Sequence, residues 1–172
     1  MTPRVDAWMR QANSDWAVAE LTAQQGFHSQ ACYHYGQSAY KALKEQLIPL
    51  GSLPPYSHAL DRLVDSLEAG GVDVSSIRTL QLKALSRMTS RTRYPSENEA
   101  PADRFDAEDS DEARSVSEQV MAFAKAAFTK YARFMYEIYT ISLRFRAFSR
   151  RVVQAGNWFS PDQQRQINIQ LA

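Results

Sequence analysis

The sequence predicts an all-α protein, an up-and-down bundle of about five helices around one core. Apolar residues recur at the three- to four-residue spacing of amphipathic helices, and no run sustains the apolar-polar alternation of a strand. Hydrophobic residues make up 44% of the 172 residues and charged residues 23%, a balance typical of chains that fold. A chain of this length can enclose one core, so we expect a single main domain.

Two long helices are predicted in the first third of the chain. The first runs from Pro3 to Gln25, where apolar residues return every three or four positions, and Gly26 provides a natural stop. The second runs from about Ser29 to Ile48 and carries bulky residues on both faces, as a central helix requires. The proline-rich stretch 49–56 that follows is expected to be a loop.

Two further helices are predicted in the middle of the chain. Ser57 is suited to cap a third helix, which ends at Gly70 and Gly71. A fourth helix starts near Ser75 and continues through Met88, with apolar residues along its length. Both should pack one apolar stripe against the rest of the bundle.

The last main helix follows a long polar connection. Residues 89–109 are interrupted by prolines, and long connections of this kind often carry function. The helix is predicted from about Asp111 into the 140s, because acidic residues gather where a helix N-terminus favours them. Its expected buried positions are Val116, Val120, Phe123, Ala127, Phe134, Ile138 and Ile141.

Charge and cysteine usage set limits on location and chemistry. The net charge of +1 gives no whole-protein field for recruiting nucleic acid or a membrane. The single cysteine, Cys32, cannot form an internal disulfide, which favours a reducing compartment. Charged residues within 1–10 are unlike a signal peptide, and no run of apolar residues is long enough to span a bilayer, so we expect a cytoplasmic protein.

A metal site is not expected, nor is a cofactor. His28 and His34 lie near Cys32, but the three groups occupy partly different helix faces and no fourth ligand is evident. Structural or surface roles are the favoured interpretation for both histidines. His58, next to the predicted cap, is expected to serve helix-start packing, with ligand contact as the alternative.

Residues 36–44, 57–60 and 93–95 form three elements that, in this order, resemble the HEPN (higher eukaryotes and prokaryotes nucleotide-binding) family. Residues 36–44 are similar to its second helix, a glutamine and small residues followed by a Glu-Lys-Ala-Leu-Lys run. Residues 57–60 are similar to its His-Asp-Leu element, and residues 93–95 match its Arg-Tyr-Pro element. The departures are Tyr40, Ala59 and Ser96, which stand where the family commonly has glutamate, aspartate and aspartate.

The resemblance covers roughly Asp6 to Met135 and implies a helical bundle. It further implies a homodimer, a minimal nucleotidyltransferase as a frequent partner, and in several branches a toxin ribonuclease. We accordingly expect a HEPN-like bundle over residues 1–148 and a C-terminal extension over 149–172, either a short helix or a flexible tail. Fold similarity alone does not transfer an activity.

The ribonuclease branches use an arginine followed four to six residues later by a histidine. A histidine can move the proton of a ribose 2′-hydroxyl while arginine holds the phosphate. In this chain no histidine follows Arg87, Arg91 or Arg93, because all three histidines precede them. A divergent ribonuclease toxin of a toxin–antitoxin pair would need a substitute acid–base group, for which Tyr94 and Glu97 are the nearby candidates.

A polar set on the predicted second helix, the fourth helix and the loop is the candidate nucleotide site. Its members are Gln37, Lys41, Lys44, His58, Arg87, Arg91, Arg93 and Tyr94. The cationic groups can bind phosphate, glutamine can read a base edge and tyrosine can stack on a base. In the alternative interpretation, these side chains make helix–helix hydrogen bonds, caps and ion pairs.

A second candidate surface follows the last helix and combines arginine with aromatic residues. Its members are Arg144, Arg146, Arg150 and Arg151, with Phe145, Phe148 and Trp158 among or after them. RNA or an acidic partner would suit this pattern, and a solvated helix end explains the arginines equally well. The favoured function is a non-catalytic nucleotide-binding or interaction module; a ribonuclease toxin and a structural helper that docks on another chain are the alternatives.

Overall fold

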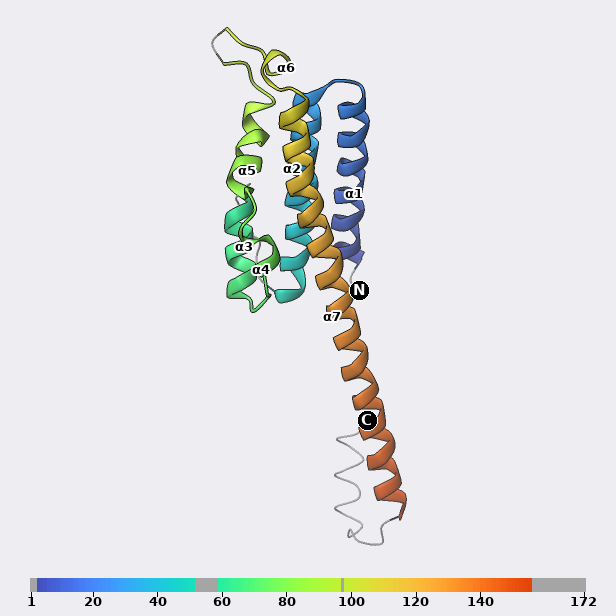
Figure 1. Cartoon of the computed structure of the whole chain (residues 1–172). Coiled ribbons are helices and arrows are strands. Elements are labelled where there is room, and N and C mark those ends of the chain that lie inside the picture. The colour runs from blue at the N-terminus through green and yellow to red at the C-terminus, as the bar shows by residue number, and fades with distance from the viewer. Residues whose placement is uncertain (1–2, 52–58, 97, 156–172) are drawn as a thin grey trace. The chain divides into compact units, whose positions relative to one another are not determined.

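The computed structural model confirms the all-α prediction (Figure 1). It describes residues 3–51, 59–96 and 98–155, with side chains described up to 127 and again at 136–142 and 145. The helices are α1 (Pro3–Gln24), α2 (His28–Leu47), the 3-10 helix η1 (Ile48–Leu50), α3 (Leu60–Ala69), α4 (Ser75–Arg78), α5 (Leu82–Arg91), α6 (Pro101–Arg104) and α7 (Ala107–Ala155). Within these ranges there is no strand, only one isolated bridge between Ser96 and Glu99.

The contacts within the chain divide it into two units, Met1–Phe128 and Thr129–Ala172. The boundary falls inside α7. The expected division into 1–148 and 149–172 stays a prediction, because much of the second unit lies outside the described residues. None of the helices in the described ranges is long and apolar enough to cross a membrane.

Helix α2 is the centre of the first unit and packs against α1, α3 and α5 (Figure 1). Its buried positions surround most of the helix, as predicted for a central element. Small residues let α1 approach closely, because Val5, Ala12 and Ala19 are buried at seven-residue intervals along α1. The turn between the two helices uses Gly26 with φ +77°, a conformation that favours glycine.

The predicted fourth helix is wrong in one respect, because it is two helices, α4 and α5. The chain turns between them, where the Leu82 N–H donates to the Leu80 carbonyl at 2.8 Å. Ile77 and Leu82 are both buried, yet residues five positions apart on one helix would face directions about 140° apart. Breaking the helix allows both side chains to reach the same core.

The helix starts after the two loops also differ from the prediction. Helix α3 begins at Leu60, whose N–H donates to Ser86 Oγ of α5 at 2.9 Å, and the predicted cap Ser57 lies outside the described residues. Helix α7 begins four residues before Asp111, because Asp106 and Asp109 exchange reciprocal N–H to carboxylate bonds at 3.1 Å. The short α6 within the 89–109 connection was not predicted.

Two predicted core positions of α7 are exposed. Val120 is buried, and Val116 and Phe123 pack partly against the core, as expected. Ile138 and Ile141 are instead 46% and 64% exposed. Both lie in the second unit, whereas the buried hydrophobic residues of the described chain all belong to the first. The side chain of Phe134 lies outside the described residues.

Candidate functional site

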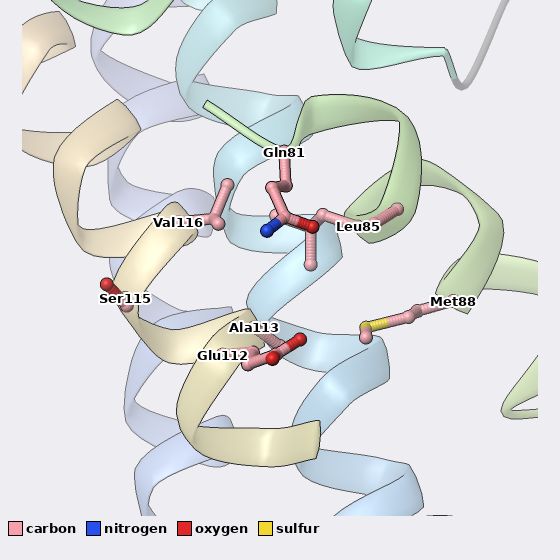
Figure 2. Close-up of a pocket in the computed structure, with 8 residues that line it drawn as sticks. Gln81, Leu85, Met88, Glu112, Ala113, Ser115 and Val116 are labelled. Carbon is pink, nitrogen blue, oxygen red and sulfur yellow. The ribbon is translucent and has the colours of Figure 1, made fainter. Parts of the chain in front are cut away.

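A shallow pocket of about 170 Å³ lies between α5 and α7 (Figure 2). Its lining is Gln81, Ala84, Leu85, Met88, Glu112, Ala113, Ser115 and Val116. The volume is below the roughly 300 Å³ at which small-molecule sites begin, so the pocket is too small for a nucleotide. The described residues of the polar set do not line this pocket, because they lie on α2 and on or just after α5.

The outward face of α2 carries Tyr33, Gln37 and Lys41 at successive four-residue steps. Side chains four apart on a helix are neighbours, so the three form one row. The row lies between α1 and α5: Lys41 contacts α1, and Tyr33 contacts Arg93 just after α5. Arg93 therefore lies at one end of this row, beside Tyr33, whereas Lys41 lies about two helical turns away at the other end, beside Asp15.

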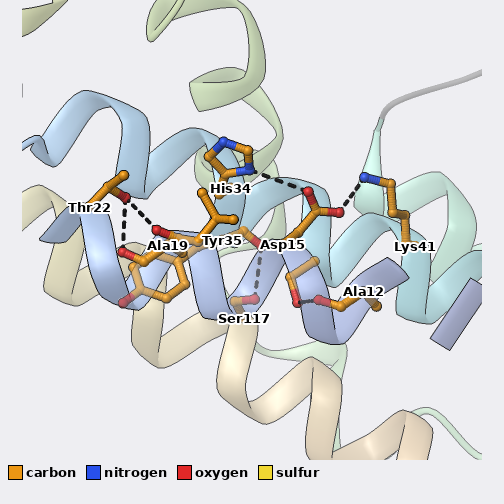
Figure 3. A network of polar contacts seen from close by, with 10 residues as sticks. Ala12, Asp15, Ala19, Thr22, His34, Tyr35, Lys41 and Ser117 are labelled. Atoms are coloured by element: carbon orange, nitrogen blue, oxygen red, sulfur yellow. Dashed lines mark hydrogen bonds and ion pairs between the residues drawn. The ribbon is translucent and has the colours of Figure 1, made fainter. Parts of the chain in front are cut away.

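Lys41 is held by an ion pair with Asp15 of α1 (Figure 3). His34 Nδ1 lies 3.3 Å from the other carboxylate oxygen of Asp15. The Asp15 side chain is only 9% exposed and the Lys41 side chain 19%, so this pair joins the two helices. Lys41 would have to share its charge between Asp15 and a ligand. Asp15 was not identified from the sequence, because its proximity to Lys41 arises only on folding.

Two buried serines join α2 to the helices on either side of it (Figure 3). Ser38 Oγ donates to the Ala12 carbonyl of α1 at 2.9 Å. Ser117 Oγ of α7 donates to the Tyr35 carbonyl of α2 at 2.8 Å. These bonds set the position of α2 between α1 and α7, and with it the position of the polar row.

Arg93 lies over two tyrosine rings. Its Cζ lies 5.4 Å from the ring centre of Tyr33 and 5.3 Å from that of Tyr94, and its Nε donates to the Thr89 carbonyl at 2.9 Å. Both Arg93 and Tyr94 are exposed. Among the described residues, no carboxylate lies within salt-bridge distance of Arg93. Its two terminal nitrogens donate no hydrogen bond to a described residue, which leaves them available for bidentate binding of a phosphate.

Other members of the predicted set are dispersed. Lys44 is buried and its Nζ lies 4.9 Å from the ring centre of Tyr40. Arg87 and Arg91 are exposed on the side of α5 that faces away from α2, because Leu85 and Thr89 are the positions that approach α2. His58 and the side chains of Arg144, Arg146, Arg150 and Arg151 lie outside the described residues.

The two described histidines have structural partners. His28 Nδ1 lies 2.9 Å from Ser110 Oγ of α7, and His34 contacts Asp15. Burial raises the pKa of the Cys32 thiol to about 12, so this cysteine is a poor nucleophile. No group of metal-binding side chains occurs among the described residues. The contacts of the two histidines fit the structural interpretation favoured for both.

A second polar cluster links α1, α2 and α7. Tyr35 Oη and Arg114 Nε both donate to Glu20 Oε1 at 2.7 Å. The Arg114 guanidinium lowers the pKa of the Glu20 carboxyl, while desolvation and the Glu20 bond raise the pKa of Tyr35. A phenol with a raised pKa stays protonated, so it serves as a hydrogen-bond donor in this cluster.

Glu45 is a carboxyl group in the core of α2, with 1% of its surface exposed. Burial raises the pKa of Glu45 from 4.5 to about 7, although the Gln46 amide donates to it. Gln46 Nε2 also donates to the Ala124 carbonyl of α7 at 2.9 Å. Sequence reasoning missed this group, because its burial depends on how the helices pack around α2.

Glu45→Gln is expected to stabilise the protein near pH 8 by about 3 kcal/mol and to change little near pH 4. Because the pKa of Glu45 is raised in the folded state, only the unfolded chain releases this proton between pH 4.5 and about 7. The free energy of unfolding of the original protein therefore falls as pH rises through this range. Urea denaturation across pH measures the effect, and Glu118→Gln at an exposed position is the control. Equal destabilisation by Glu45→Gln at both pH values would contradict the raised pKa of Glu45 in the folded state.

The comparisons with known proteins agree with the fold. The model of the HEPN domain family matches residues 5–127. The crystal structure of TT1696 from Thermus thermophilus is similar with a TM-score of 0.65 and 22% identity, covering 72% of this chain and 97% of that one. ST0689, an archaeal HEPN homologue, is similar with a TM-score of 0.54 and 20% identity, covering 72% and 96%. No curated protein matches the sequence. With its family match extending over most of the chain and its helices in the same fold, the chain belongs to the HEPN domain family.

Proposed function

We propose that this HEPN domain is a non-catalytic module that binds the phosphate of a nucleotide at Arg93. The observation that carries the proposal is the exposed Arg93, whose guanidinium lies over the rings of Tyr33 and Tyr94 with its Nε bonded to the Thr89 carbonyl. A guanidinium fixed in this way loses little side-chain entropy when it binds. Tyr94, which is 63% exposed, offers a ring on which the base can stack.

A catalytic role has no comparable support. The arginine–histidine spacing of the ribonuclease branches is missing, and His28 and His34 are both engaged with other side chains. Of the two substitutes that a divergent ribonuclease would need, Tyr94 lies against the Arg93 guanidinium and Glu97 lies outside the described residues. The proposal is therefore one of binding without turnover.

Arg93→Gln is expected to weaken nucleotide binding at least about tenfold, because a charge-assisted hydrogen bond to phosphate is lost. Isothermal titration of the full chain with ATP, GTP and a short RNA measures the affinity. Arg87→Gln is the matched control, since Arg87 is exposed on the side of α5 that faces away from Tyr33. No binding at millimolar nucleotide, or equal losses in both variants, would contradict the proposal.

The family resemblance also leads us to propose a homodimer that acts with a partner such as a minimal nucleotidyltransferase, in the cytoplasm. Light scattering after size-exclusion chromatography tests the first of these points. The dimer should have twice the chain mass of 19.5 kDa. A strictly monomeric mass at all concentrations would contradict it, without affecting the proposal for Arg93.

A further inference from the structure

The part of α7 in the second unit exposes large apolar side chains on more than one face. The exposed fractions are 69% for Tyr136, 46% for Ile138, 62% for Tyr139, 64% for Ile141 and 67% for Phe145. By helical register, the two isoleucines and Phe145 share one face and the two tyrosines lie on the opposite side. A helix that is apolar on opposite sides is normally covered by other protein. This segment, residues 129–155, is called the distal helix below.

The composition of the distal helix is that of a protein interface. It contains six aromatic residues and five arginines, but only one lysine, one glutamate and no aspartate. Interface cores are enriched in aromatic residues, methionine and arginine, and depleted in lysine, glutamate and aspartate. A surface that only tracks a nucleic-acid backbone has no comparable need for exposed isoleucine, so Ile138 and Ile141 favour a protein partner.

The charge of the distal helix indicates what kind of partner protein would bind it. The distal helix has a net charge of +5, whereas residues 1–128 contain 13 basic and 17 acidic residues, a net charge of −4. Two distal helices laid against each other would bring +5 against +5, which opposes pairing between copies through this segment. An acidic surface is complementary to it instead.

We propose that the distal helix is a docking element for a partner protein that presents an apolar groove rimmed by acidic side chains. Ile138, Ile141 and Phe145 would enter the groove, and the arginines of the helix would meet the acidic rim. This region lies beyond residue 127, where the match to the HEPN family ends. The proposal is independent of Arg93, which lies in the first unit.

The proposal is tested with a helical peptide that presents apolar side chains flanked by acidic ones. The peptide has three heptads, with leucine at positions a and d, glutamate at positions e and g, and alanine elsewhere. We expect fluorescence anisotropy to show that the full chain binds this peptide, more weakly as salt increases, and does not bind the same peptide with lysine in place of glutamate. The double variant Ile138→Ser, Ile141→Ser should weaken binding at least about tenfold, because it removes two apolar side chains that the complex would bury. Leu21→Ser, at a position 59% exposed on α1, is the matched control, and Arg93→Gln should also leave peptide binding unchanged.

Four outcomes would overturn the proposal. One is absence of binding, or binding that the double variant leaves unchanged. Another is tight binding of oligouridine without binding of the acidic peptide, which identifies a nucleic-acid surface. A dimer that the double variant converts to monomer identifies a second copy as the occupant. Peptide binding that appears only after Trp158→Ser in the full chain identifies the chain's own C-terminal residues.

Discussion

Asp15→Ala is expected to lower the free energy of unfolding by about 3 kcal/mol, because it leaves the ammonium of Lys41 unpaired and largely buried. Asp15 contacts both Lys41 and His34, so one substitution removes two links between α1 and α2. An exposed pair would contribute less than about 1 kcal/mol, but the Asp15 side chain is only 9% exposed. Urea denaturation at neutral pH measures the change.

The double variant Asp15→Ala, Lys41→Met separates the cost of an unpaired charge from the value of the pair. Methionine keeps the packing of the lysine stem without its charge, so we expect it to recover more than half of the lost stability. Asp6→Ala, which breaks the exposed Asp6–Arg10 pair of α1, is the control and should have little effect. A loss below about 0.5 kcal/mol for Asp15→Ala would show that Lys41 is satisfied by water, and would leave it free for a ligand.

Gly36→Leu is expected to destabilise the protein by about 2–3 kcal/mol, because α5 passes close to α2 at this residue. A Cβ at Gly36 would lie 3.6 Å from the Leu85 carbonyl oxygen and from Thr89 Oγ1, which is ordinary contact. The further carbons of leucine have no such space and would displace α5. Gly36→Ala should instead fit and gain up to about 1 kcal/mol from its higher helix propensity.

The two Gly36 variants also connect packing with the proposed site. The Thr89 carbonyl that orients Arg93 belongs to the same turn of α5 that approaches Gly36. Gly36→Leu should therefore weaken nucleotide binding even in the fraction that remains folded, whereas Gly36→Ala should not. Thermal unfolding and titration of both variants provide the comparison. Equal stability of the two would contradict the close approach of the helices.

The helices and several of their ends could be predicted because they depend on local spacing and on residues such as Gly26. The break between α4 and α5 could not, because it depends on both Ile77 and Leu82 reaching one core. Periodicity also placed Ile138 and Ile141 in the interior, since an apolar stripe looks the same whether its own chain or another molecule covers it. Element type was therefore more predictable than burial.

The candidate site was predictable only where its residues share one helix. Gln37 and Lys41 are four positions apart on α2, so their neighbourhood follows from the sequence. The contacts of Lys41 with Asp15 and of Arg93 with Tyr33 join residues distant in the chain, and only the packing of the helices reveals them. Lys41 and Arg93 also differ in their contacts: Lys41 is paired with Asp15 within the fold, while Arg93 is exposed and has no carboxylate partner among the described residues.

An NMR titration of the full chain with ATP, following the side-chain Nε–H signals of arginine, tests the central claim most directly. Binding at the Arg93 guanidinium predicts that the Arg93 signal and the backbone amides of Tyr33 and Tyr94 shift together, while the Arg87 signal stays in place. An unchanged Arg93 signal at millimolar ATP, or shifts confined to other parts of the chain, would contradict the account.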